Sequence, residues 1–320
     1  MDLPEPTSTT EVSTTPLPSR HRGIFNGSIS WLTAGLVSQA HSRLFPGNAG
    51  DIDYERLGRR RAELQAEHFV ITTKVGSKVG VHDYGGGEGD FIVVLAHGNT
   101  RPTRYLKELI ETLQSCNIRV VGRDFVGYDA SSQVPFADGA LEVAAHANDE
   151  AVLDHLEEKH PNAKFILCGR SIGTFFWAGQ LHRPSVVGAI GIVPFKRAAT
   201  VIQNFVKTVV PWPIHLAIPV QTAVGEAFPK DFLSDEMPGF TTKGFSIESF
   251  PPDVKGKRVT LFPASVDELV PHAEVDELED MLEKGGCEVT TTWNEGDHRS
   301  LPTAEQMQEA LEFIKNGASN

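Results

Sequence analysis

After about residue 65, apolar runs rich in Val, Ile and Phe alternate with segments whose apolar residues repeat at helical spacing. This alternation, with Gly, Pro, Asn and Asp between the segments, is typical of a mainly parallel sheet joined by helices. The first two runs flank Gly76, which predicts an antiparallel hairpin leading into the parallel part. Eight strands are predicted, at Phe69–Lys74, Lys78–Tyr84, Phe91–Ala96, Arg119–Asp124, Lys164–Cys168, Val186–Val193, Arg258–Pro263 and Glu288–Trp293. Helices are predicted at 102–115, 139–160, 172–182, 272–285 and 303–315.

Three segments do not follow this alternation. Residues 1–22 are mostly Ser, Thr and Pro, so burial cannot offset their ordering entropy, and we predict a disordered tail. Residues 23–65 are predicted to be a helical extension, with an amphipathic helix over 29–45. Residues 196–257 carry seven prolines and several aromatic side chains, which predicts a small cap over a pocket. The main domain, predicted at 66–320, therefore contains one insertion.

The overall charge argues against anionic macromolecules as partners. The chain has 29 basic and 42 acidic residues, and its formal net charge of −13 repels phosphate backbones, so no nucleic acid partner is expected. Peripheral membrane contact through residues 29–45 is an open alternative, because this helix carries Trp31 and precedes basic residues. The sequence has no run of about 18 apolar residues and no secretory signal pattern. We expect a soluble, cytoplasmic protein, with specialised secretion through the tail as the alternative.

The three cysteines, Cys116, Cys168 and Cys287, are far apart in the sequence and do not show the spacing of a metal site. Their number and spacing favour a reducing compartment. Cys168 is expected to be an inert residue buried in a strand. Neither a metal nor a cofactor is expected.

A serine lies between a predicted strand and a predicted helix. Residues Phe165–Thr174 read FILCGRSIGT and contain the pattern G-x-S-x-G at Gly169, Ser171 and Gly173. In this context the serine occupies a sharp, strained turn that presents its hydroxyl above the sheet, and the glycines allow close backbone approach. The pattern alone also fits an ordinary serine turn, but its position favours Ser171 as a nucleophile.

A serine nucleophile requires a base and an acid that orients the base. His298 lies in the loop NEGDH after the last predicted strand, where it can reach the carboxyl edge of the sheet. Asp267, in the loop SVDELVP, is the candidate acid, and Ser, Asp and His then follow in the required chain order. Glu268 is a close competitor, and Asp276 is a weaker one because it falls within a predicted helix.

Two backbone N–H groups are needed to bind a developing oxyanion. The amide of Ile172, directly after the candidate nucleophile, is the first candidate. The strand FIVVLA runs into His97, Gly98 and Asn99, so the amide of Asn99 is the second candidate and Gly98 gives room for close approach. His97 is expected to orient this loop, with proton transfer as the alternative.

These motifs resemble the α/β-hydrolase superfamily, particularly its monoglyceride-lipase, serine-aminopeptidase-like and acyl-protein-thioesterase-like branch. The resemblance spans roughly residues 69–316 and implies an eight-stranded, mostly parallel sheet with helices on both faces. VGRDFVGYDASS, beginning at Val121, is similar to the family's D-x-x-G-x-G-x-S loop, but Asp129 replaces a glycine. The stretch VDELVP is similar to D-E-x-x-P, although PASV precedes Asp267 where relatives carry His-Gly. Arg170 would either contact substrate or be exposed to solvent.

Two functions remain open from the sequence. The first is a serine hydrolase that cleaves an ester, thioester or amide of a small-molecule or acylated substrate through an acyl-enzyme on Ser171. The second is a non-catalytic ligand-binding protein or receptor that keeps the fold. The aromatic residues of the predicted cap could line an acyl pocket or form the core of the cap itself.

Overall fold

The structure is a computed structural model that describes residues 64–87, 89–99, 101–134, 140–198, 200–201, 204, 247 and 254–318. The predicted tail and N-terminal extension, and most of the predicted cap, lie outside the described residues. Within the described ranges, every helix is too short or too polar to cross a lipid bilayer.

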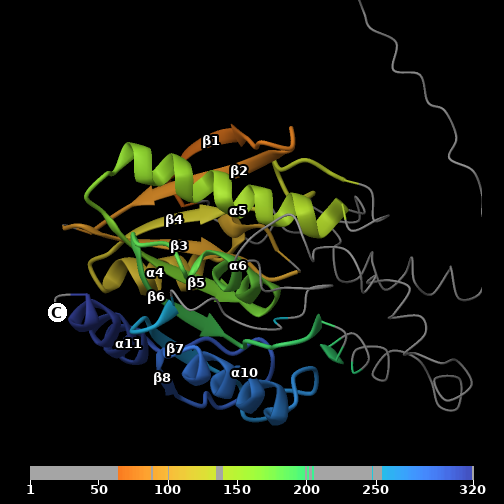
Figure 1. The fold of residues 1–320 in the computed structure, drawn as a ribbon, viewed down its shortest axis with the longest axis vertical. Coiled ribbons are helices and arrows are strands. Elements are labelled where there is room, and N and C mark those ends of the chain that lie inside the picture. Colours follow the sequence, from red (N-terminus) through yellow and green to blue (C-terminus); the bar gives the residue numbers. More distant parts are fainter. Residues whose placement is uncertain are drawn as a thin grey trace, which may run out of the picture.

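An eight-stranded sheet forms the centre of the fold (Figure 1), and this confirms the predicted number of strands. The strand order is β1-β2-β4-β3-β5-β6-β7-β8. Strand β2 is antiparallel to both β1 and β4, as expected for an initial hairpin, and the remaining pairs are parallel. The strands are β1 Glu67–Thr72, β2 Lys78–Gly85, β3 Phe91–Ala96, β4 Arg119–Arg123, β5 Lys164–Arg170, β6 Val186–Ile192, β7 Arg258–Phe262 and β8 Glu288–Thr291.

Helices cover both faces of the sheet, as Figure 1 shows. Apolar residues of α5, α6 and α10 pack into one core cluster, and those of α4 and α11 pack into a second cluster on the opposite face. The bounds are α4 Lys107–Ser115, α5 Ala140–Lys159, α6 Thr174–Gln180, α10 His272–Lys284 and α11 Ala304–Gly317. Together with the sheet order, this arrangement is the α/β-hydrolase fold.

The central strands are apolar along their whole length because helices cover both of their sides. In β3, FIVVLA, every residue after Phe91 is buried, and β5 is buried from Phe165 to Gly169. Because β3 and the strands after it in the sheet run parallel, their carboxyl ends meet at one edge. The loops that contain Asn99, Ser171 and His298 all follow strands at this edge.

Two predicted helices are shorter than expected, and both differences concern this edge. The helix predicted at 102–115 is divided into a 3-10 turn, η1 Thr103–Tyr105, and α4. The division follows from Thr103, whose amide donates to Asp124 and whose hydroxyl donates to the Arg123 carbonyl, so that η1 is tied to the end of β4. The helix predicted at 172–182 begins with another 3-10 turn, η3 Ser171–Gly173, before α6.

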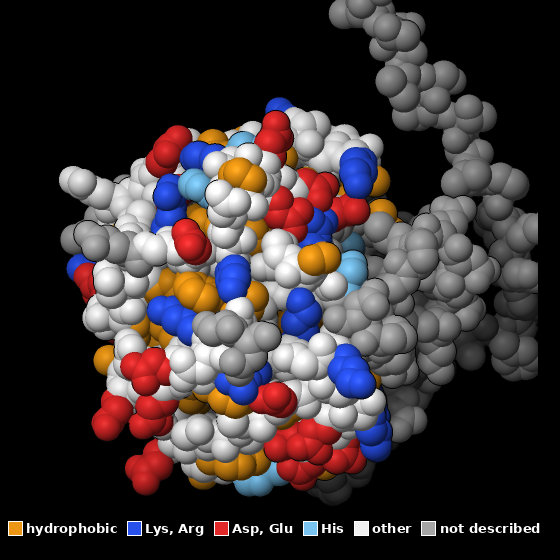
Figure 2. All heavy atoms as spheres, turned by 60° about the vertical axis from the view of Figure 1, so that its left-hand side comes forward, with side chains coloured by type: hydrophobic (Ala, Val, Ile, Leu, Met, Phe, Trp, Pro, Cys, Tyr) orange, Lys and Arg blue, Asp and Glu red, His pale blue; other side chains and the backbone are white. Residues whose placement is uncertain are grey.

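The surface carries charges of both signs. On the face shown in Figure 2, acidic and basic side chains are interspersed, and apolar side chains lie between them. This face therefore does not present a field of a single sign, despite the acidic composition of the chain.

Candidate active site

Ser171 occupies a strained turn between β5 and α6. Its φ is +52°, in the left-handed region that residues with a Cβ rarely adopt, and it is only 5% exposed. Such strain persists where the surrounding structure leaves the backbone no alternative, and it is common at functional sites. The turn holds the hydroxyl of Ser171 at the carboxyl edge of the sheet, as the G-x-S-x-G pattern predicts.

The two glycines of the pattern are required by close backbone contacts. A Cβ added to Gly169 would lie 2.6 Å from the carbonyl carbon of Gly173 and 2.8 Å from the nitrogen of Thr174. A Cβ added to Gly173 would overlap the carbonyl oxygen of Ala96 and lie 2.9 Å from the His97 oxygen. No flexible side chain is involved that could move away, so neither position has room for alanine.

The structure brings His298 to Ser171 and Asp267 to His298. The Nε2 atom of His298 lies 2.9 Å from Ser171 Oγ, and its Nδ1 atom lies 2.7 Å from Asp267 Oδ2. A carboxylate only accepts hydrogen bonds, so Nδ1–H donates to Asp267 and Nε2 accepts from the serine hydroxyl. In this tautomer the imidazole can remove the proton of Ser171.

Asp267, rather than its neighbour Glu268, is the carboxylate that reaches the imidazole. The other carboxylate oxygen, Oδ1, accepts hydrogen bonds from the amides of Leu269 and Val270, at 2.9 and 3.0 Å. The Asp267 side chain is 2% exposed, whereas Glu268 is exposed. Asp276, the third sequence candidate, lies on the exposed side of α10. Of the three candidate carboxylates, Asp267 is therefore the one that contacts His298.

The loop after β3 packs against the serine. A Cβ added to Gly98 would lie 3.4 Å from Ser171 Cβ and 3.1 Å from Arg170 Nη1, so a side chain there would crowd the nucleophile. Asn99 follows in the same loop, and Ile172 is the first residue after the serine, with 3% exposure. The loop that contains Asn99 thus meets Ser171 at Gly98, and the amide of Ile172 directly follows the serine in the chain; both amides remain candidates for oxyanion binding.

His97 anchors this loop. Its Nδ1–H donates to the Gly98 carbonyl at 2.5 Å, and its Nε2 accepts from the Phe125 amide at 2.8 Å. Burial lowers the pKa of His97 to about 4, although the carboxylate of Asp124 acts in the opposite direction. A neutral imidazole with both nitrogens in backbone hydrogen bonds is suited to orienting the loop and poorly placed to transfer protons to a substrate.

The loop after β4 supports the same structure from the other side. The hydroxyl of Tyr128 donates to the Asn99 carbonyl, and its ring packs against His97 with centroids 4.7 Å apart. Asp129 has a φ of +48°, the conformation that a glycine at this position would adopt readily. Aspartate is among the few residues that tolerate this region, so Asp129 can occupy a position where the family pattern has glycine.

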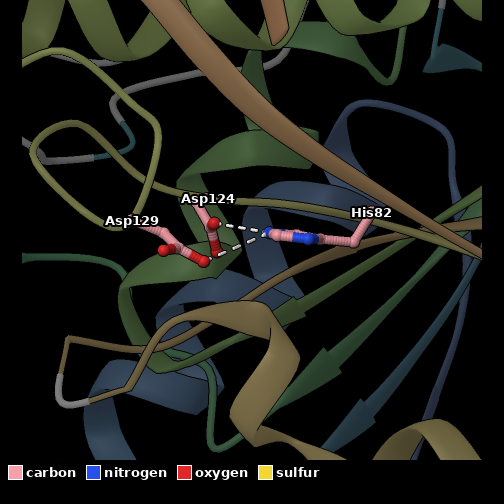
Figure 3. Close-up of side chains that lie close together, drawn as sticks. All are labelled: His82, Asp124 and Asp129. Atoms are coloured by element: carbon pink, nitrogen blue, oxygen red, sulfur yellow. Dashed lines mark hydrogen bonds and ion pairs between the residues drawn. The ribbon is translucent and has the colours of Figure 1, made fainter. Parts of the chain in front are cut away.

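Behind this loop lies a polar cluster of His82, Asp124 and Asp129, shown in Figure 3. His82 Nε2 lies 2.6 Å from Asp124 Oδ2 and 3.9 Å from Asp129 Oδ2. Burial raises the pKa of Asp124, but the hydrogen bond and charge of His82 outweigh it, so the pKa is below the usual value. The donor types would suit a divalent cation, but Arg104 already lies 3.0 Å from Asp129. We therefore interpret the cluster as support for η1 and the β4 loop.

Arg170 has a contact that the sequence did not predict. Its Nη2 donates to the carbonyl oxygen of His298 at 3.0 Å. The guanidinium is therefore hydrogen-bonded within the protein even without a substrate. The residue adjacent to the candidate nucleophile thus fixes the loop of the candidate base. The only sequence signal for this contact was an arginine inside the G-x-S-x-G pattern.

Cys168 lies in β5 and is fully buried, as expected. Burial raises the pKa of its thiol to about 12, so the thiol stays protonated and is a poor nucleophile. All three cysteines are buried and free.

Comparison with known proteins supports the fold. The sequence matches the family model described as serine aminopeptidase, S33, over residues 87–236. A comparison with curated protein sequences gives no match.

Solved structures of α/β-hydrolases superpose on most of the chain. An esterase of Pyrococcus furiosus, Pf2001, aligns with a TM-score of 0.59 and 17% identity, covering 80% of this chain and 91% of the esterase. An alpha-beta hydrolase of Vibrio vulnificus aligns with a TM-score of 0.54 and 16% identity, covering 95% of this chain and 98% of that protein. At these identities the likeness shows the fold.

Proposed function

Because the chain has the α/β-hydrolase fold and matches the serine aminopeptidase family model over residues 87–236, we propose that it is a serine hydrolase that cleaves an ester, thioester or amide through an acyl-enzyme on Ser171. The observation that carries the proposal is the continuous hydrogen-bond chain from Ser171 Oγ through His298 to Asp267, with distances of 2.9 and 2.7 Å. The esterase named above and the matched serine aminopeptidase family agree with this reaction class.

In the first half of the reaction, the serine oxygen attacks the substrate carbonyl while its proton moves to Nε2 of His298. The carbonyl oxygen becomes negative, and the amides of Ile172 and Asn99 stabilise this charge. The imidazolium then gives its proton to the leaving group as the carbon–oxygen, carbon–sulfur or carbon–nitrogen bond breaks. Ser171 carries the acyl group at this stage.

In the second half, His298 takes a proton from water and the resulting nucleophile attacks the acyl carbonyl. Collapse of the second tetrahedral intermediate releases the acid and returns the proton to Ser171. Asp267 stabilises the imidazolium in both halves and fixes its orientation, since one carboxylate oxygen contacts His298 Nδ1 and the other accepts from the amides of Leu269 and Val270.

The test is labelling with a fluorophosphonate probe together with turnover of short-chain aryl esters, thioesters and anilides. Wild-type protein should label at one site, and Ser171→Ala should lose both labelling and turnover, by about 10⁶-fold in kcat. Ser115→Ala is the matched control, because Ser115 is exposed on α4 and its hydroxyl donates only to Thr112. Undiminished turnover by Ser171→Ala would refute the proposal. Folded wild-type protein that does not label would point to the non-catalytic, ligand-binding alternative.

A further inference from the structure

Arginines in the described part of the chain divide into two groups. Of the nine that it contains, six form ion pairs with carboxylates. These pairs are Arg104 with Asp129, Arg119 with Asp83, Arg123 with Asp149, Arg183 with Asp154 and Glu157, Arg197 with Glu274 and Glu277, and Arg258 with Glu288. The other three, Arg101, Arg170 and Arg299, do not form an ion pair with any described carboxylate. The chain has 42 acidic residues and 29 basic ones, so carboxylate partners are abundant. The lack of an ion pair at these three arginines therefore needs an explanation.

The three exceptions lie beside the three loops of the candidate active site, and we call them the site arginines. Arg101 follows Asn99 by two residues, Arg170 directly precedes the nucleophile, and Arg299 directly follows His298. Arg101 and Arg299 are exposed, and Arg170 is half-buried. Three segments far apart in the sequence thus each carry one positive charge next to a loop of the candidate site.

Arg170 contacts the loops on both sides of it, at His298 and at Gly98. Its Nη2 donates to the His298 carbonyl at 3.0 Å, and its Nη1 lies 3.1 Å from the position that a Cβ on Gly98 would occupy. The guanidinium therefore extends from the loop of the base to the oxyanion loop. It has five N–H donors, of which this hydrogen bond uses one.

The charges of both neighbouring arginines act on Arg170. Burial lowers its pKa, the charges of Arg101 and Arg299 lower it further, and the carboxylates of Asp267 and Asp297 raise it. Asp267 is committed to His298, and Asp297 accepts a hydrogen bond from the Arg299 amide. An arginine remains protonated under these conditions, so the positive charge stays in place.

We propose that the site arginines recognise an anionic group, a carboxylate or a phosphate, on the substrate that Ser171 cleaves. This inference rests on the proposed function. A guanidinium has a planar pair of N–H donors that matches either a carboxylate or a phosphate. The acidic chain as a whole repels anions, but three arginines near Ser171 make the local potential more favourable for an anion. Substrates with a neutral or cationic group at the same position would lack this interaction.

The test compares matched esters that differ in one charge. On the leaving-group side they are para-butyryloxybenzoate, its methyl ester and para-butyryloxyphenyl phosphate. On the acyl side they are the para-nitrophenyl monoester of glutarate and para-nitrophenyl pentanoate. The variant is the double substitution Arg101→Ala and Arg299→Ala, which leaves Arg170 and its bond to His298 in place. The matched control, Lys255→Ala with Lys284→Ala, also removes two exposed positive charges, near the opposite edge of the sheet.

The measured quantity is the ratio of kcat/KM for the anionic ester to kcat/KM for its neutral partner, because this ratio cancels differences in folding and enzyme concentration. On at least one side, the double arginine variant should lower the ratio by roughly fivefold or more, and the lysine control should not. Salt at about 0.5 M should lower the ratio for wild-type protein. Comparing the ratio for para-butyryloxybenzoate with that for para-butyryloxyphenyl phosphate shows whether a carboxylate or a phosphate is preferred. A ratio that is the same in wild-type protein and the arginine variant, on both sides, would overturn the inference.

A binding measurement separates this inference from the proposed function. Calorimetry on Ser171→Ala compares monomethyl glutarate with dimethyl glutarate, and neither result depends on turnover. The monoanion should bind more tightly, and the two arginine substitutions should remove that advantage. Equal binding of the two esters would contradict the anion site even if Ser171 is nucleophilic. If the monoanion binds more tightly but wild-type protein does not label with fluorophosphonate, the anion site is supported and the hydrolase proposal is contradicted.

Discussion

The turn that carries Ser171 and the loop that carries His298 meet at one hydrogen bond, but they are held in different ways. The serine turn is surrounded by backbone: Gly169 lies against Gly173, and Gly173 lies against the end of β3. The histidine loop has exposed neighbours on both sides of His298, and individual hydrogen bonds hold it. The carbonyls of Asn294 and Gly296 accept from backbone amides of the preceding loop, His298 donates to Asp267, and Arg170 donates to the His298 carbonyl.

Steric exclusion therefore positions the candidate nucleophile, whereas individual hydrogen bonds position the candidate base. A close-packed backbone cannot relax around an added atom, so the serine turn should tolerate no change. A loop held by individual hydrogen bonds should lose function stepwise as each bond is removed.

Gly173→Ala should abolish fluorophosphonate labelling and ester turnover. The added methyl would overlap the Ala96 carbonyl and lie 2.9 Å from the His97 oxygen, so the cost should reach about 4–5 kcal/mol or more, enough to distort the turn or unfold the domain. Circular dichroism and labelling measure the two outcomes. Gly76→Ala is the control: its Cβ meets no atom within 4 Å, and its φ of +79° should cost only about 1 kcal/mol of stability. Normal labelling of Gly173→Ala would contradict the view that close backbone packing positions the serine turn.

Asp267→Asn should fold normally and lose about 10⁴-fold in kcat, because the amide favours the wrong tautomer of His298. Steady-state kinetics with a neutral ester measures the effect. Glu268→Gln is the matched control, since it removes the same charge from the adjacent, exposed residue and should change kcat little. Equal losses in the two variants would show that proximity of charge, and not the hydrogen bond, is what matters.

His97 should make the free energy of unfolding depend on pH. Its pKa is about 4 in the folded protein and 6.5 in the unfolded chain, so above pH 6.5 both states are neutral and the stability is complete. As the pH falls below 6.5, only the unfolded chain takes up the proton, and stability falls by on the order of 3 kcal/mol by pH 4. Urea unfolding at neutral and acidic pH should show a smaller loss for His97→Gln than for wild-type protein. An identical loss in both proteins would contradict the assignment.

Tyr128→Phe should have the smallest effect. It removes the hydroxyl that donates to the Asn99 carbonyl, a single hydrogen bond worth about 1 kcal/mol, so kcat should fall roughly fivefold with little change in KM. Tyr84→Phe, at another buried tyrosine on β2, is the control. A loss as large as that of Asp267→Asn would mean that the oxyanion loop is as sensitive as the base.

Much of the fold was predictable because its signals are local. The period of apolar residues set the strands, and β3 begins and ends at the predicted residues, Phe91 and Ala96. Some predicted boundaries were wrong, in one case because of a contact with a residue far away in the sequence. The helix expected from residue 102 is interrupted because Thr103 binds Asp124, 21 positions away. Strand β8 ends at Thr291, two residues before the predicted end.

The site divides in the same way. The sheet–helix alternation and the G-x-S-x-G turn could be read from the sequence, because both follow from periodicity and from steric demands between near neighbours. Folding was needed to select Asp267 over Glu268 as the partner of His298, and to bring Arg170 to the histidine loop. Those contacts join residues 31 and 128 positions apart, so they depend on how the whole sheet packs and which side chains it turns toward each other.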